Sequence, residues 1–183
     1  GFKAIVLTVD TPVPSPKERD LRNNTTRTHE LGNFRGSDRP NNEISGTDET
    51  PGWNVSQSVP LTWKELEWLR SLTQLPLVLK GIRTAEDAHV AVESGVNGIQ
   101  VSTHGGRQID ALPAPIDMVP AIADRVGDKT TIIFDSGMRS GVDAARAVAL
   151  GADAAFAGKA FLWSLGALGG RGPGHLIDLF KDE

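Results

Sequence analysis

The chain contains no cysteine among its 183 residues, which excludes disulfide bonds and catalysis by a thiol. This absence is compatible with a reducing compartment. Apolar runs of the roughly 18 residues that a membrane-spanning helix requires are also missing, and no signal-peptide pattern opens the chain. We therefore expect a cytoplasmic protein with no membrane partner.

A surplus of basic residues is missing as well, because the net charge is -4 and the isoelectric point is near 5.6. Such a chain has no general attraction for nucleic acids or anionic membranes. Hydrophobic residues make up 39% of the sequence, which is enough for one core. We predict a globular protein with no nucleic-acid partner and no metal site.

What the chain does have is a regular alternation of strand and helix patterns. Strands are expected at 4–10, 77–79, 98–102, 131–134 and 154–157, and helices at 61–72, 84–94, 115–126, 141–150 and from Phe161 onwards. The first strand is almost continuously apolar, as in a strand buried on both faces of a parallel sheet. Strand signals recur about every 30 residues, the period of a βα unit, and predict an α/β fold with a parallel sheet.

One segment interrupts this alternation. From about residue 24 to residue 60 the composition changes to Asn, Thr, Ser, Gly, Pro and scattered charges. Loops of this length in a compact domain are uncommon and are usually functional lids or disordered segments. We predict a long lid-like or disordered loop at 24–60.

Polar and glycine-rich signals follow the predicted strands at their carboxyl ends, where barrels and open α/β sheets keep their chemistry. They are Asp10, Lys80, His104, residues 135–137 and residues 158–159. His104 can accept a proton near neutral pH, and Arg107, three residues later, can bind a carboxylate through two hydrogen bonds. A His-x-x-Arg pair taken alone is more often a capping histidine beside a solvated arginine. The functional prediction therefore rests on all of the polar and glycine-rich residues at the strand ends together.

The sheet can be open or part of a barrel. An eight-stranded barrel typically needs about 250 residues, and only five βα units are visible here. Either the sheet is open, or three units are missing from the front of the chain.

Five motifs in one order decide between these alternatives. They are LTVDTP at 7–12, LKGI at 79–82, STHGGRQ at 102–108, DSGMR at 135–139 and ALGAD at 149–153. In these motifs the chain resembles the FMN-dependent 2-hydroxy acid oxidases and dehydrogenases, the family of glycolate oxidase, lactate oxidase and mandelate dehydrogenase. The resemblance implies a partial TIM (β/α)8 barrel with parallel strands four to eight, strands one to three being absent. Residues 1–183 would be the C-terminal part of a single FMN-binding domain.

The resemblance also implies roles at the substrate. His104 would accept the proton, Asp10 would hydrogen-bond the imidazole and stabilise its charged form, and Arg107 would bind the substrate carboxylate. Lys17 stands where the family usually has an arginine near substrate and flavin, and lysine cannot make the bidentate contact.

A second set of residues would hold FMN by the same resemblance. Lys80 would lie beside the flavin N1/C2 carbonyl, and Thr8 and Ser102 would contact the isoalloxazine edge. Backbone N–H groups around Gly137 and Gly158 would bind the phosphate. The other residues that would hold FMN by this resemblance are Asp135, Arg139 and Lys159. Ser136 and Lys159 replace a common glycine and a common arginine of the family.

The reaction implied is oxidation of an (S)-2-hydroxy acid of the lactate, glycolate or mandelate type to the 2-oxo acid, with two electrons passing to FMN. Whether the base removes the proton from carbon or from oxygen stays open, and so does the final electron acceptor. The expected partners are the hydroxy acid and the N-terminal part of the barrel, in the same protein or as a separate fragment. By resemblance the protein would be a homo-oligomer, a tetramer.

Two other functions remain as alternatives. Another FMN-binding or phosphate-binding barrel, such as one resembling type 2 isopentenyl diphosphate isomerase, would share the phosphate loops but would not explain Asp10, His104 and Arg107. A catalytically silent half-barrel could also serve as a binding or assembly module.

Overall fold

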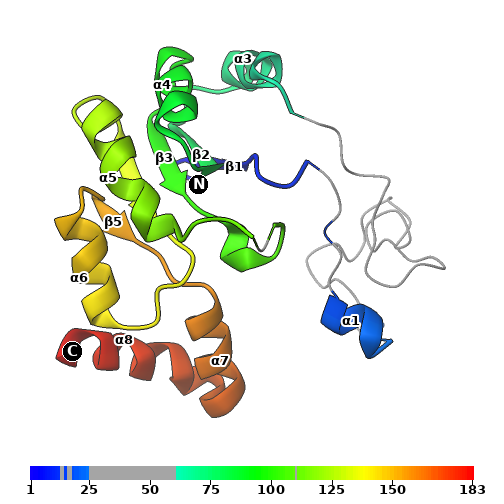
Figure 1. The fold of residues 1–183 in the computed structure, drawn as a ribbon, viewed down its shortest axis with the longest axis vertical. Helices are drawn as coiled ribbons and strands as arrows, with labels where there is room; N and C mark the ends of the chain where they lie inside the picture. The colour runs from blue at the N-terminus through cyan, green and yellow to red at the C-terminus, as the bar shows by residue number, and fades with distance from the viewer. Residues whose placement is uncertain (13–14, 16–17, 25–60, 110) are drawn as a thin grey trace. The chain divides into compact units, whose positions relative to one another are not determined.

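The computed structural model describes residues 1–12, 15, 18–24, 61–109 and 111–183 (Figure 1). Two compact units are distinguished: Gly1–Asp10 together with Leu61–Glu183, and Thr11–Pro60. Within the second unit, helix α1 (Glu18–Arg22) carries an exposed ion pair of 2.9 Å between Arg22 and Glu18. The predicted loop at 24–60 lies, apart from Asn24, outside the described residues.

The first unit is built on a parallel sheet of five strands in chain order. The strands are β1 (Ile5–Thr8), β2 (Leu77–Ile82), β3 (Gly98–Val101), β4 (Thr131–Phe134) and β5 (Ala154–Ala155). Neighbouring strands are parallel throughout, so the predicted α/β class and the parallel sheet of a partial barrel are confirmed. Strand β2 runs three residues further than predicted, whereas β5 ends two residues earlier.

The prediction that the first strand is buried on both faces is wrong for β1. Its Val6 side chain is 49% exposed. The reason is its position, because β1 lies at the edge of the sheet and pairs only with β2.

Helices alternate with the strands, within two residues of the predicted ranges. Thr62 caps α3 (Trp63–Leu72) in a capping box with Glu65, and Thr84 caps α4 (Ala85–Glu93). The Thr62 hydroxyl and backbone N–H groups that donate to Glu65 lower the pKa of that carboxyl. The remaining helices are α5 (Pro115–Val126), α6 (Gly141–Ala149), α7 (Lys159–Leu168) and α8 (Gly172–Asp182), with short 3-10 turns η3 (His104–Gly106) and η4 (Gly169–Arg171).

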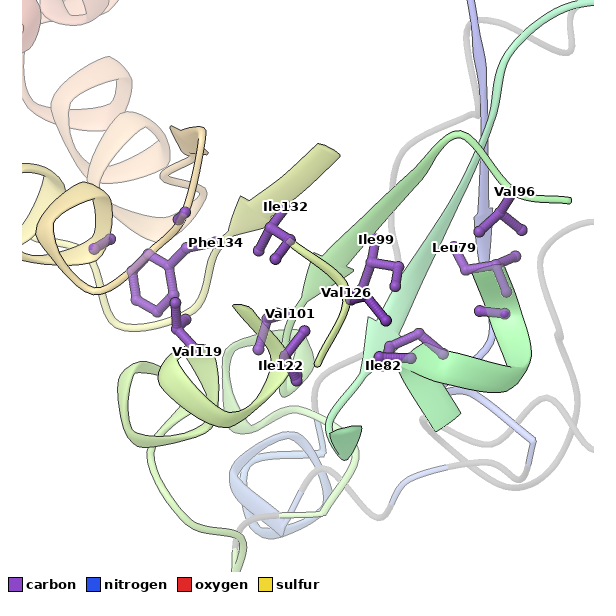
Figure 2. Packing of buried hydrophobic residues seen from close by; sticks show 14 of the residues in the cluster. Leu79, Ile82, Val96, Ile99, Val101, Val119, Ile122, Val126, Ile132 and Phe134 are labelled. Carbon is purple, nitrogen blue, oxygen red and sulfur yellow. The ribbon is translucent and has the colours of Figure 1, made fainter. Parts of the chain in front are cut away.

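The core lies between the sheet and the helices. In Figure 2, Ile99 and Val101 of β3 point towards Val119, Ile122 and Val126 of α5, and all five side chains are fully buried. Burial of each such aliphatic side chain stabilises the fold by about 1.5–3 kcal/mol. β3 is buried along its whole length, so residues 102–107, which follow it, are attached to a well-packed strand.

The C-terminal segment differs from the single helix that the apolar pattern predicts. A helix already begins at Lys159 and ends at Leu168, and α8 follows after the 3-10 turn. Phe161 and Phe180 pack edge to face with ring centroids 6.5 Å apart, which joins α7 to α8. Among the described residues, no helix is long and apolar enough to cross a membrane.

Candidate active site

A cavity of about 390 Å³ opens at the carboxyl ends of β2 to β5. This volume falls within the range typical of small-molecule sites, about 300–1,000 Å³. The predicted site residues that line the cavity are Lys80, His104, Arg107, Asp135, Gly137, Arg139, Gly158 and Lys159. The sheet therefore brings together most of the residues that the motifs single out.

Two of the predicted residues form a buried carboxylate–imidazole pair. The Nδ1 atom of His104 lies 3.1 Å from Oδ1 of Asp10, whose side chain is only 2% exposed against 34% for His104. An ionised carboxylate can only accept hydrogen bonds, so Nδ1 carries the proton and donates it. This tautomer leaves Nε2 of His104 as an acceptor that can take up a proton.

Gly81 makes room for the Asp10 carboxylate. It lies at a register shift between Lys80 and Ile82, with φ of +108°. A Cβ atom at this position would stand 2.5 Å from Cβ and 2.6 Å from Cγ of Asp10, closer than non-bonded atoms approach. Only glycine can adopt this positive φ without strain and also leave room for the Asp10 carboxylate.

The turn that carries His104 has an unusual backbone. His104, Gly105 and Gly106 all have positive φ values, of 56°, 66° and 71°. The hydroxyl of Ser102, which is fully buried, accepts a hydrogen bond from the His104 backbone N–H at 3.0 Å. The imidazole therefore leaves the strand in a direction that the backbone fixes.

Lys80 belongs to a second cluster beside the histidine. Its ammonium donates to the Ser102 hydroxyl at 3.1 Å and lies 3.7 Å from Oδ2 of Asp135. The side-chain amide of Gln100 donates to the same Asp135 oxygen. The charge of Lys80 is thus held in the wall of the cavity by a carboxylate and a hydroxyl.

Two cations and two glycine-rich segments border the cavity at the ends of β4 and β5. Added Cβ atoms at Gly137 and Gly158 would meet nothing within 4 Å, so both backbones border open space. The Arg139 guanidinium lies 5.8 Å from the ring centroid of Trp163, and the Lys159 ammonium donates to the Gly105 carbonyl oxygen at 2.6 Å. Two positive charges therefore border this end of the cavity.

The loop before α6 is held by its own caps. Ser140 accepts a hydrogen bond from the Asp143 N–H, and Asp143 accepts one from the Arg139 N–H at 3.0 Å. The Arg139 backbone N–H, with help from Ser140 and Arg146, lowers the pKa of Asp143. The Asp143 carboxylate thus holds the Arg139 backbone at the start of α6.

The remaining predicted residues lie at the edges of this arrangement or outside it. Thr8 pairs with Lys80 in the sheet and is not part of the cavity wall, whereas Arg107 is exposed at the wall. Lys17 lies outside the described residues. Within the described part of the chain, no group of three potential metal ligands occurs.

Sequence reasoning missed residues that line the cavity, such as Met138, Phe156 and Leu162, and residues that contact the predicted site residues, namely Gln100, Gly81 and Trp163. Gln100 is a polar residue in an otherwise apolar strand and is 4% exposed, a pattern that could have drawn attention to it. The contacts of Gly81 and Trp163 left no signal in the sequence, because both depend on residues distant in the chain.

Comparisons with known proteins identify the family of the chain. The chain matches the FMN-dependent dehydrogenase family over residues 1–183. It is 43% identical to peroxisomal (S)-2-hydroxyacid oxidase GLO4 of Arabidopsis thaliana and 38% identical to an L-lactate dehydrogenase of Pseudomonas putida, in both cases over 100% of this chain. The match covers 50% and 54% of those proteins, so the chain spans about half of their length.

Solved structures give the same result. The crystal structure of a mandelate oxidase superposes with a TM-score of 0.83 at 35% sequence identity, covering 100% of this chain and 50% of that chain.

Proposed function

Because the chain belongs to the FMN-dependent dehydrogenase family, we propose that the protein oxidises an (S)-2-hydroxy acid to the corresponding 2-oxo acid. The observation that carries the proposal is the position of His104, which Asp10 holds by its Nδ1 in a cavity that Arg107 and Lys80 also line. The names of the relatives, an (S)-2-hydroxyacid oxidase, an L-lactate dehydrogenase and a mandelate oxidase, support this class of substrate.

The residues of the cavity fit FMN, the cofactor of the family. A flavin phosphate needs N–H donors and positive charge, and the loops at Gly137 and Gly158 offer backbone groups next to open space. Arg139 and Lys159 supply two charges to the same end of the cavity. We assign Gly137, Arg139, Gly158 and Lys159 to the phosphate, with Lys159 as a single-point contact because it lacks the fork of an arginine.

Lys80 fits the other end of the cofactor. Its ammonium is fixed by Ser102 and Asp135, and its side chain is 19% exposed. When bound, FMN would accept the two electrons that the alcohol loses. A fixed positive charge stabilises negative charge that develops beside it, so Lys80 would favour the reduced cofactor. Thr8, Ser102 and Asp135 belong to this end of the proposed site.

His104 acts as the base in this proposal. Oxidation of a CH–OH group to a carbonyl removes two protons and two electrons; Nε2 accepts one proton, and the other would pass together with both electrons to bound FMN. Asp10 stabilises the imidazolium that results, as a buried carboxylate does in other enzymes with an acid–histidine pair. This role is the same whether the proton leaves carbon or oxygen.

Arg107 orients the substrate. Its guanidinium presents parallel N–H donors that match a carboxylate, and it stands three residues after the base. A 2-hydroxy acid bound in this way has its hydroxyl-bearing carbon next to its anchored carboxylate. Arg107, which binds the carboxylate, and His104, the base, then lie in the same turn, so the conformation of this turn fixes the distance between them. We also propose Lys17 as a substrate contact, only because it occupies the sequence position where the family usually has an arginine near the substrate.

The organisation of the whole protein is part of the proposal. We propose that residues 1–183 form the C-terminal part of one FMN-binding barrel, completed by an N-terminal portion that covers the edge of β1. A homotetramer and a cytoplasmic location are proposed as well, although the plant relative is named as peroxisomal. Gel filtration and cell fractionation test these two points.

Anaerobic titration of the purified protein tests the function. We expect bound flavin whose visible absorbance bleaches on addition of lactate, glycolate or mandelate. Bound flavin that no 2-hydroxy acid bleaches would favour an isomerase-like activity, and a colourless folded protein that takes up no FMN would favour a silent binding module.

A further inference from the structure

Three successive backbone N–H groups in the turn that carries His104 are bound by only two side chains. Ser136 Oγ accepts hydrogen bonds from the N–H groups of Thr103 at 3.2 Å and of Gly105 at 2.9 Å. The N–H of His104, between them, donates to Ser102 Oγ at 3.0 Å. Two hydroxyls, 3.2 Å apart, therefore bind residues 103–105, and the N–H groups of Gly106 and Arg107 close the turn by bonds to Thr103 and His104.

The turn needs such support because its backbone is in an unfavourable region. His104 has φ of 56°, where an L-residue with a side chain crowds its own carbonyl oxygen. The 3-10 turn that His104 begins has only three residues, so few hydrogen bonds within it oppose relaxation. The two serine hydroxyls supply the missing restraint from neighbouring strands.

Ser136 is itself in a strained conformation. Its φ of 75° makes it one of three non-glycine residues with positive φ in the described part of the chain, together with Asn24 and His104. Such conformations persist where surrounding contacts determine them, and they cluster at functional sites. The hydroxyl of Ser136 also donates to Oδ1 of Asp135 at 2.8 Å, which fixes its rotamer.

The same hydroxyl connects two parts of the site. On one side it binds the turn that carries the base. On the other side it binds Asp135, whose second carboxylate oxygen lies 3.7 Å from the Lys80 ammonium. Ser136 therefore links the position of His104 to the position of the charge that would face the flavin.

We propose that Ser136 is a positioning residue that fixes the His104 turn, so that the imidazole keeps its hydrogen bond to Asp10. This proposal rests on the proposed function, because it places Ser136 behind the catalytic base. Ser136 acts through the backbone of residues 103–105. The Ser102 hydroxyl also binds the turn, but it already accepts hydrogen bonds from Lys80 and from the His104 N–H. It therefore cannot replace the two bonds that Ser136 makes.

Two variants separate the hydroxyl from the backbone strain. Ser136→Ala removes the hydroxyl and keeps a Cβ at φ of 75°, whereas Ser136→Gly removes the hydroxyl and relieves the strain. If the Ser136 hydroxyl holds the His104 turn, Ser136→Ala and Ser136→Gly should show the same changes in amide exchange and flavin reduction. Ser94→Ala is the matched control, because the Ser94 hydroxyl caps α4 by bonding Val90 and has no contact with the site.

The first measurement is residue-level hydrogen exchange on the intact protein, without added substrate. We expect both Ser136 variants to exchange faster at the amides of Thr103 and Gly105 by about ten-fold or more, while Ser94→Ala matches the wild type there. Unchanged exchange at these two amides would overturn the proposal.

The second measurement is the rate constant of anaerobic flavin reduction per bound flavin, which does not depend on how much protein is folded. We expect a loss of about ten-fold in both Ser136 variants, the size of effect that a misplaced base produces, with a smaller change in substrate KM. A loss of less than two-fold, despite faster exchange, would overturn the positioning role.

The two measurements distinguish this proposal from the function on which it rests. A wild-type protein whose bound flavin no 2-hydroxy acid reduces would overturn the proposed function and the positioning role with it. Normal wild-type reduction with unaltered Ser136 variants would overturn the positioning role alone.

Discussion

The two ends of the cavity are built in different ways. At the reaction end, defined by Asp10, Lys80, Ser102 and His104, side chains bind one another, and Asp10 and Ser102 are buried. At the anion end, defined by Gly137, Arg139, Gly158 and Lys159, both cations are exposed; Arg139 lies on a loop, whereas Lys159 begins α7 and its ammonium bonds Gly105 of the His104 turn. The reaction end is therefore set before any ligand binds, whereas the anion end presents charge to open space.

This difference predicts how the two ends respond to substitution. Changes at the reaction end should lower the rate of the chemical step and leave the flavin bound. Changes at the anion end should weaken cofactor binding and leave the rate per bound flavin intact. The predictions below test this separation, beginning with the largest effect.

His104→Ala should retain FMN and lower the rate of flavin reduction by about a thousand-fold, since it removes the positioned base. Stopped-flow reduction with excess 2-hydroxy acid measures this rate. His175→Ala, an exposed histidine of α8, is the control and should reduce at the wild-type rate. Near-normal reduction by His104→Ala would remove His104 from the mechanism.

Gly81→Ala should lower flavin reduction by about a hundred-fold, because the new Cβ displaces the Asp10 carboxylate. It should also lower the free energy of unfolding by about 3 kcal/mol through strain and overlap. Gly95→Ala is a matched control, since Gly95 has φ of +81° but nothing within 4 Å of the added atom. That variant should lose about 1–2 kcal/mol and keep its rate. Equal rates in both variants would contradict the role of Gly81.

Arg139→Ala should raise the dissociation constant of FMN by about ten-fold or more, the effect of losing one charged hydrogen bond. Trp163→Leu, which removes the ring beneath the guanidinium, should raise it by about two- to five-fold. Fluorescence titration of the protein freed of flavin measures both. Arg125→Ala, at the exposed end of α5, should leave FMN affinity unchanged. A reduced rate per bound flavin in Arg139→Ala would break the separation of the two ends.

Asp143→Asn should have the smallest effect, lowering the free energy of unfolding by about 0.5–1 kcal/mol at pH 7. The folded-state pKa of Asp143 is lowered by the Arg139 N–H, so this contribution is complete above the unfolded-state pKa of about 4. It is lost as the pH falls through the folded-state pKa. Urea unfolding at pH 7 and pH 3 should therefore show the two proteins converge at low pH, and Asp178→Asn, on exposed α8, should show no such difference.

The sequence predicted most of this architecture because its signals are local. The helical patterns at 61–72 and 84–94 identified α3 and α4, and the apolar runs identified the strands. The strand ends also predicted which side chains gather at the cavity, because parallel strands present their carboxyl ends at one edge of a sheet.

Features that depend on contacts between distant segments were not predictable. The exposure of Val6 follows from the edge position of β1, and the need for Gly81 follows from its contact with Asp10, some 70 residues earlier in the sequence. The break between α7 and α8, by contrast, has a local signal that sequence reasoning missed, because it falls at Gly169, whose φ is +60°.

A crystal structure of the protein with FMN and a bound 2-oxo acid tests the central claim most directly. We predict that Arg107 binds the carboxylate and that Nε2 of His104 lies about 3 Å from the oxygen on the adjacent carbon, with Nδ1 still bonded to Asp10. A ligand whose carboxylate is held elsewhere, or whose reacting carbon lies out of reach of His104, would contradict the account.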